Sequence, residues 1–125
     1  MKLVIAGSRG IDEISTLKKA IKESPFDISD VDKVITGGAD GVDTLAMNFC
    51  IDEKINFEVV YPDYDKFSHK VAPIKRNEEM AEKGDCLLAI WDGKSKGTKN
   101  MIENSKSQDL DVYVHNTGTT IGDFG

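Results

Sequence analysis

Cysteine and long apolar runs are both scarce in this chain. Cys50 and Cys86 are the two cysteines among 125 residues; both sit in apolar surroundings, and no CxxC spacing links them. We therefore expect two buried thiols in a reducing compartment rather than a disulfide framework. No run approaches the roughly 18 apolar residues that a membrane helix needs, and the N-terminal run is too short for the core of a signal peptide. These absences predict a cytoplasmic protein.

Positive charge is also in short supply. The chain has 16 Lys+Arg against 22 Asp+Glu, a formal net charge of -6. This balance argues against a broad nucleic-acid footprint, whose affinity comes mostly from neutralised phosphates. Arg9 and Arg76 are the only arginines. A guanidinium binds phosphate or carboxylate through two parallel hydrogen bonds, so we expect both arginines to bind an anion.

The apolar residues that are present alternate between two patterns. Short, nearly continuous runs are typical of strands covered on both faces, and they occupy 2–6, 33–36, 57–61, 86–91 and 112–115. Between them, helical spacing relates Ile14, Leu17, Ala20 and Ile21; Val42, Leu45, Ala46 and Phe49; Ile74, Met80 and Ala81; and Met101, Ile102 and Ser105. The alternation predicts one α/β domain over 1–115, a Rossmann-like three-layer fold with about five parallel strands and helices on both faces. Residues 116–125 lack periodicity, and we expect a flexible tail or a segment that docks on a neighbour.

In an open parallel sheet, ligands bind at the carboxyl ends of the strands, where the strand order reverses. After the first strand, Gly7 and Gly10 allow a tight turn, Ser8 offers a hydroxyl and Arg9 a guanidinium. The alternative for this motif is a plain turn with a solvated arginine.

After the second strand comes the sequence VITGGADGVD, residues 34–43. Gly37 and Gly38 give clearance for a ligand, and we expect a helix to begin within 39–43. We interpret Asp40 as the cap of that helix, which needs no ligand. Asp43 is the candidate for binding sugar hydroxyls, as carboxylates do in Rossmann sites.

After the third strand a long polar loop leads to Pro73, which predicts a helix start with Arg76 in its first turns. We interpret His69, in this loop, as an exposed polar residue rather than a catalytic base.

After the fourth strand, Gly93 and Gly97 bracket lysines and hydroxyls, and Thr98 can cap the helix that follows. Trp91 either stacks on a base or closes the core.

Four ordered motifs, GSR, TGGADGVDTLA, PIKRNEEMA and WDGKSKGT, resemble the SLOG superfamily of Rossmann-like proteins. That group includes the Smf/DprA DNA-processing proteins and the LOG nucleotide phosphoribohydrolases, and the chain looks most like its small stand-alone, YspA-like and YpsA-related branch. The resemblance covers about residues 2–115. It implies a nucleotide-derived ligand and a homodimer or larger homo-oligomer. The residues that match or flank its motifs are Gly7, Ser8, Arg9, Gly37, Gly38, Asp43, Arg76, Asn77, Trp91, Asp92, Gly93, Ser95, Gly97 and Thr98.

The chain departs from the LOG pattern at one position that matters for catalysis. The resemblance implies a glutamate at the third position after Gly97-Thr98, where this chain has Met101, and methionine cannot transfer a proton. Glu103 lies roughly 200° further around a helix and is a poor substitute. The catalytic residues thus stay unknown, with Asp43 and Asp92 as candidates.

The sequence predicts a binding module for a nucleotide or nucleotide-derived ligand. Phosphate would bind loop 92–98 with Arg9 and Arg76, and the sugar would lie near Asp43. The alternative is an enzyme that hydrolyses N-glycosidic bonds of nucleoside monophosphates; a DprA-like role on single-stranded DNA is disfavoured by the acidic charge. We expect no metal, no cofactor and no membrane partner.

Overall fold

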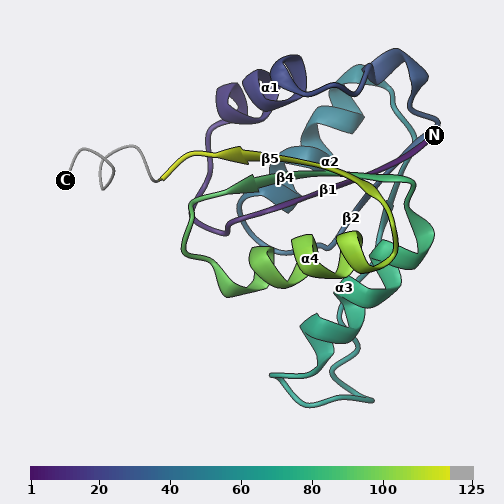
Figure 1. Ribbon diagram of the computed structural model, residues 1–125, viewed down its shortest axis with the longest axis vertical. Coiled ribbons are helices and arrows are strands. Elements are labelled where there is room, and N and C mark those ends of the chain that lie inside the picture. Colours follow the sequence, from purple (N-terminus) through teal and green to yellow (C-terminus); the bar gives the residue numbers. More distant parts are fainter. Residues whose placement is uncertain (119–125) are drawn as a thin grey trace.

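A computed structural model describes residues 1–118, which form five strands and four α-helices around one parallel sheet (Figure 1). The strands are β1 (Lys2–Gly7), β2 (Lys33–Thr36), β3 (Phe57–Val59), β4 (Cys86–Trp91) and β5 (Asp111–Asn116). The helices are α1 (Ile14–Glu23), α2 (Val42–Glu53), α3 (Ala72–Lys83) and α4 (Lys96–Ser107), with a short 3₁₀ turn η1 (Ile28–Asp30). The predicted α/β, Rossmann-like three-layer fold is therefore confirmed.

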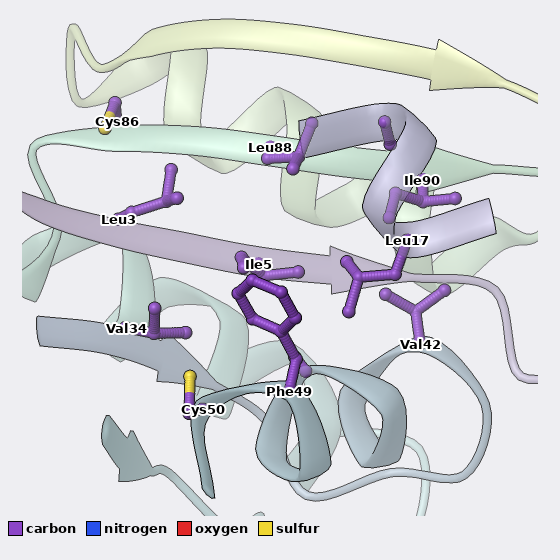
Figure 2. Packing of buried hydrophobic residues seen from close by; sticks show 12 residues of the cluster. Leu3, Ile5, Leu17, Val34, Val42, Phe49, Cys50, Cys86, Leu88 and Ile90 are labelled. Carbon is purple, nitrogen blue, oxygen red and sulfur yellow. The ribbon is translucent and has the colours of Figure 1, made fainter. Parts of the chain in front are cut away.

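Two hydrophobic clusters hold the three layers together. Helices α1 and α2 cover one face of the sheet, and α3 and α4 cover the other (Figure 1). In the first cluster, Leu17 of α1 and Phe49 of α2 pack toward Ile5 of β1 (Figure 2). The second joins Val4 and Leu87 of the sheet to helix residues such as Met80 and Met101. Both faces of the central strands are thus buried, as their continuous apolar runs predict.

Cys50 and Cys86 are free thiols buried in the first cluster, at 0% and 2% exposure. Burial raises the pKa of each thiol to about 11, so both are uncharged at neutral pH. They act in the core as small apolar side chains.

Three details differ from the sequence-based expectation. Strand β3 ends at Val59, two residues before the predicted end, because its neighbour β2 ends at Thr36, the residue paired with Val59. Ile74 does not join the apolar face of α3; its side chain is 44% exposed. Strand β5 continues to Asn116, and the Thr117 amide donates to the Trp91 carbonyl at 2.8 Å. The rest of the expected tail, 119–125, lies outside the described residues.

The strand order is β3-β2-β1-β4-β5, so the chain reverses direction across the sheet between β1 and β4. This is the topological switch point at which such sheets bind ligands. Among residues 1–118, no helix is long and apolar enough to cross a membrane.

Candidate functional site

A cleft of about 360 Å³ lies at the carboxyl edge of the sheet. Its walls come from the ends of β1 and β4, the turn before α2, and the first turns of α3 and α4. The lining residues are Ala6, Gly7, Arg9, Gly10, Ala39, Asp43, Pro73, Arg76, Asn77, Met80, Asp92, Ser95, Gly97, Thr98 and Met101. The cleft is therefore at the switch point that the topology indicates.

The ends of β1 and β4 are tied together at the cleft floor. A Cβ on Gly7 would lie 2.3 Å from the Ile90 carbonyl oxygen, so only glycine permits this approach. The Asp92 amide donates to Ser8 Oγ at 3.0 Å. Ser8 is 1% exposed and does not line the cleft. Its hydroxyl holds the two strand ends together, which differs from the ligand contact predicted from the sequence.

Asp92 shapes the glycine-rich loop after β4. Its Oδ1 accepts hydrogen bonds from the Lys94 and Ser95 amides, both at 2.8 Å. These two amides hold the pKa of Asp92 below its usual value, so the side chain is a carboxylate at neutral pH. The Trp91 indole N–H donates to the Ser95 carbonyl at 3.0 Å. Trp91 thus braces the loop, packs against the second hydrophobic cluster as one of its two predicted roles requires, and does not line the cleft.

The N-terminus of α4 faces the cleft. Ser95 is the cap, because its Oγ accepts from the Thr98 amide at 3.3 Å. The prediction that Thr98 caps this helix is therefore wrong, since the helix begins two residues earlier, at Lys96. Within residues 1–118 the Lys96 and Gly97 amides donate to no acceptor, and a Cβ on Gly97 would meet nothing within 4 Å. Two free amides and open space suit an anion.

The turn before α2 contains both aspartates of the GGADGVD motif. Helix α2 begins at Val42, and Gly41 is its N-cap residue, at a φ of +76°. The prediction that Asp40 caps the helix is wrong, because Asp40 lies two residues before the first helical residue and is exposed. Asp43 rather than Asp40 holds the turn before α2, because its Oδ2 accepts from the Ala39 amide at 3.0 Å.

Asp43 is the most deeply buried carboxylate of the cleft, at 5% exposure. Its Oδ1 and the neighbouring Thr36 Oγ1 are buried and have no hydrogen-bond partner within residues 1–118. Burial raises the pKa of Asp43 above its usual value, although the Ala39 amide, the charge of Arg76, the Thr36 hydroxyl and the Gly37 amide act in the opposite direction. Asp43 therefore has an unused hydrogen-bonding atom and holds a proton more readily than an ordinary aspartate.

Arg76 lies beside Asp43, in the first turns of α3. Its Nη1 donates to the Gly37 carbonyl, and its Nε donates to Asn77 Oδ1 at 3.0 Å. A Cβ on Gly37 would lie 2.7 Å from Arg76 Nη1 and 3.0 Å from Asp43 Oδ2, so this glycine gives room to both side chains. Burial lowers the pKa of Arg76, while the charge of Asp43 raises it. Nη2 has no partner within residues 1–118 and remains available to a ligand.

Asn77 connects α3 to the glycine-rich loop. It is 5% exposed, and its Nδ2 donates to the Gly97 carbonyl at 3.3 Å and to Asn100 Oδ1 at 3.0 Å. Arg9 approaches from the end of β1 and is exposed, with no hydrogen bond or ion pair to any residue of 1–118. The two arginines thus differ: two hydrogen bonds hold the Arg76 guanidinium, whereas that of Arg9 has none within residues 1–118.

A second depression of about 350 Å³ adjoins the cleft. The two share three residues, Arg9, Ala39 and Arg76. The remaining walls of this second depression, the tyrosine groove, are Gly37, Gly38, Asp40, Tyr61, Pro62 and Tyr64.

The structure brings most of the sequence-predicted site residues together. The cleft contains Gly7, Arg9, Asp43, Arg76, Asn77, Asp92, Ser95, Gly97 and Thr98, and the tyrosine groove contains Gly37 and Gly38. Ser8, Trp91 and Gly93 line neither. Sequence reasoning missed Thr36, Tyr61 and Asn100. Thr36 was detectable as a polar residue ending an apolar strand, whereas Asn100 carried no signal.

Two remaining expectations concern catalytic groups. His69 is exposed in the loop after β3 and stacks at a tilt on Tyr64, with 5.1 Å between ring centroids. Met101 lines the cleft at 1% exposure, whereas Glu103 is exposed and lies outside it. Glu103 therefore does not replace the missing glutamate.

Among residues 1–118, no group of three or more His, Cys, Asp or Glu side chains is arranged to hold a metal ion.

Comparisons with known proteins identify the fold. No protein-family model matches the chain, and no curated protein matches its sequence. Among solved structures, the chain is similar to DNA processing protein A (DprA) from Streptococcus pneumoniae, with a TM-score of 0.75 and 16% identity. The match covers 97% of this chain and 52% of DprA, so the chain spans about half the length of that protein. The chain has the Rossmann-like fold found in DprA.

Proposed function

We propose that this protein binds a nucleotide or nucleotide-derived small molecule at the cleft between β1 and β4. We also propose that it belongs to the small stand-alone, YspA-like branch of the SLOG superfamily and works in the cytoplasm as a homodimer or larger homo-oligomer. The ordered motifs support the branch, together with a DprA-like fold over nearly the whole chain.

The observation that carries the proposal is a set of unused donors around one cleft. Arg76 Nη2, the Arg9 guanidinium and the Lys96 and Gly97 amides all lack partners within residues 1–118. A phosphate has several acceptor oxygens and a charge that suits both a guanidinium and a helix N-terminus. Phosphate is thus the ligand group that matches this set best.

Asp43 supports the assignment of the sugar. Its Oδ1 is an acceptor without a donor, and a ribose hydroxyl is a donor of suitable size. A buried carboxylate oxygen without a partner is costly, so a ligand that donates to it gains affinity. This pairing also explains an acidic residue in a phosphate-binding cleft, since the positive charge comes from Arg9 and Arg76.

A thermal-shift panel of nucleotides and nucleotide second messengers tests the proposal. A ligand at about 100 times its dissociation constant adds roughly 2.7 kcal/mol to the free energy of unfolding, a readily measured shift. Arg76→Lys should reduce the thermal shift for each hit, because lysine cannot donate the two parallel hydrogen bonds of a guanidinium. If folded protein shows no shift with any member of the panel, the proposal is wrong.

A second candidate function is the hydrolysis of an N-glycosidic bond. The burial of Asp43 beside the cleft, which raises the pKa of its carboxyl, favours this function, because a general acid must hold a proton near neutral pH. Asp92 is not suited to this role, since two amides stabilise its charged form. Chromatography of the same hits distinguishes the functions: an enzyme releases free base and Asp43→Asn stops the release, whereas a binding module leaves the nucleotide intact.

A further inference from the structure

Within residues 1–118 the cleft offers no aromatic ring on which a nucleobase could stack, and we assign its two guanidinium groups, of Arg9 and Arg76, to the phosphate. None of the lining residues in the described part of the chain is aromatic. Trp91 directly precedes Asp92 of the cleft lining, but its indole N–H donates to the Ser95 carbonyl within the glycine-rich loop. Nucleobases bind proteins mostly by stacking on aromatic or guanidinium planes. A nucleotide with its phosphate in the cleft therefore needs an aromatic surface outside it.

The tyrosine groove supplies such a surface. Tyr61 and Tyr64 are 66% and 49% exposed, so each ring presents much of its apolar area to solvent. The position of Tyr61 depends on Gly38, which has a φ of +72°; a Cβ there would lie 2.6 Å from Tyr61 Cε1. The ring thus lies directly over the backbone of the acidic turn.

Tyr64 is also held in a defined place. Its ring contacts His69, and the preceding Asp63 Oδ1 accepts from the Asp65 and Lys66 amides, both at 3.1 Å. The connection from β3 to α3 projects from the body of the molecule at the foot of Figure 1, yet its local hydrogen bonds give it a fixed turn. Tyr64 is near enough to Arg76 to act on its pKa. The two tyrosines therefore stand beside the arginine that we assign to phosphate.

The groove and the cleft are continuous through Arg9, Ala39 and Arg76, which line both. An anion bound by the two arginines would sit where the two spaces meet. From that point one part of a ligand can enter the cleft toward Asp43, and another can enter the groove toward the tyrosines.

We propose that the tyrosine groove is a base-binding subsite, in which Tyr61 and Tyr64 stack against the planar ring of the nucleotide whose phosphate lies on Arg9 and Arg76. This inference rests on the proposed function, because the shared arginines fix where the ring begins. It assigns recognition of the ring to the segment between β3 and α3 and leaves the glycine-rich loop to the phosphate.

Three kinds of probe separate the ring from the phosphate: the four nucleoside monophosphates AMP, GMP, CMP and UMP; ribose 5-phosphate, which lacks the base; and adenosine, which lacks the phosphate. Calorimetric titrations should show at least one monophosphate binding about tenfold more tightly than ribose 5-phosphate, the range expected for one stacked base. Replacing both rings, in Tyr61→Leu/Tyr64→Leu, should remove that preference and leave ribose 5-phosphate affinity unchanged.

Two further variants give the comparison its controls. Arg76→Lys should weaken the monophosphates and ribose 5-phosphate together and change adenosine little. Ile51→Ala removes an exposed apolar side chain of α2 that lines neither space, and it should change no affinity. Circular dichroism of each variant confirms that it is folded.

The outcomes distinguish the two proposals. If ribose 5-phosphate binds as tightly as every monophosphate, or the double tyrosine variant keeps the full preference, the base-binding subsite is wrong while phosphate binding in the cleft stands. If neither the monophosphates nor ribose 5-phosphate bind to folded protein, the base-binding subsite for these nucleotides is wrong; if the full panel of nucleotides and second messengers also gives no thermal shift, the proposed function is wrong as well.

Discussion

The loops that follow β2 and β4 both place an aspartate at the cleft, but the two carboxylates are in opposite states. Asp92 accepts two backbone amides through one oxygen, and its pKa is lowered. Asp43 is 5% exposed, its Oδ2 accepts the Ala39 amide, and burial raises its pKa. Both hold their own loop in shape. Of these two carboxylates, Asp43 has a buried oxygen, Oδ1, without a hydrogen-bond partner in residues 1–118.

The difference separates two uses of the same residue type. The hydrogen bonds of Asp92 serve the glycine-rich loop, where they leave the Lys96 and Gly97 amides open to an anion. Asp43 gives one oxygen to its turn and keeps the other for a ligand or a proton. Backbone amides and burial, not residue identity, decide which aspartate is structural and which is available for chemistry.

Exchanging one glycine for alanine near each aspartate should give the largest contrast in stability, with Gly41→Ala before α2 as the larger of the two effects. Gly41→Ala should lower the free energy of unfolding by about 3 kcal/mol, because φ is +76° and the new Cβ would lie 2.4 Å from the Arg9 carbonyl oxygen. Gly97→Ala, in a helix and in open space, should raise it by about 0.5 kcal/mol. Urea unfolding measures both.

The same pair also reports on the ligand. The added methyl of Gly97→Ala occupies the space left for phosphate, so this variant should bind AMP more weakly even though it is more stable. A Gly97→Ala protein that binds AMP as well as the wild type would contradict the assignment of phosphate to this helix N-terminus.

Arg76→Lys should weaken AMP binding by about tenfold, because lysine has no planar fork to hold Gly37 and a phosphate at once. Lys70→Ala removes an exposed charge of the preceding loop and is the matched control; it should leave the dissociation constant within about twofold of wild type. Calorimetry on both variants gives the ratio. Equal losses would mean that general positive charge, rather than the guanidinium geometry, attracts the ligand.

Trp91→Phe tests the bracing of the glycine-rich loop. The substitution keeps an aromatic ring but loses the hydrogen bond to the Ser95 carbonyl, so the free energy of unfolding should fall by about 1 kcal/mol. Affinity for adenosine should stay the same, since the base is assigned to the tyrosine groove. Weaker adenosine binding in this variant would return Trp91 to the role of a stacking residue.

The two aspartates should give stability profiles of opposite slope in acid, the smallest effect at any single pH. The folded-state pKa of Asp43 is raised, so the folded protein holds its proton longer, and the contribution of Asp43 to stability falls as pH rises from the unfolded to the folded pKa. The folded-state pKa of Asp92 is lowered, so its contribution is present above the unfolded pKa and is lost as pH falls toward the folded value.

Unfolding of Asp43→Asn and Asp92→Asn between pH 3 and pH 7 measures these slopes. Relative to wild type, Asp43→Asn should become more stable as pH rises, and Asp92→Asn should become less stable. Parallel profiles for the two variants would show that the carboxylates do not differ as described.

Much of this arrangement could be predicted from the sequence, for a physical reason. Buried parallel strands are apolar throughout, so the strand ends stand out as the first polar or glycine residues after each apolar run, as at Gly7, Thr36 and Asp92. The topological rule then places those ends on one edge. Arg76 was identified by its chemistry, because it is one of two arginines among 16 basic residues.

The parts that the sequence did not predict depend on local geometry. Asp40 and Asp43 are equally good caps by composition, and only the glycine at φ +76° moves the helix start past Asp40. Ser95 rather than Thr98 caps α4, because the helix begins at Lys96 and Ser95 Oγ accepts the Thr98 amide. The sequence left Trp91 between stacking on a base and closing the core. Its hydrogen bond to the Ser95 carbonyl, which the sequence could not predict, assigns it to the glycine-rich loop instead of the ligand.

The most direct test of the central claim is an NMR titration of ¹⁵N-labelled protein with AMP, observing the backbone amides of both loops. Our account predicts saturable shifts at the Lys96 and Gly97 amides, with smaller changes near Asp43, and ribose 5-phosphate should reproduce the shifts at Lys96 and Gly97. Binding that leaves the Lys96 and Gly97 amides unchanged would contradict the account.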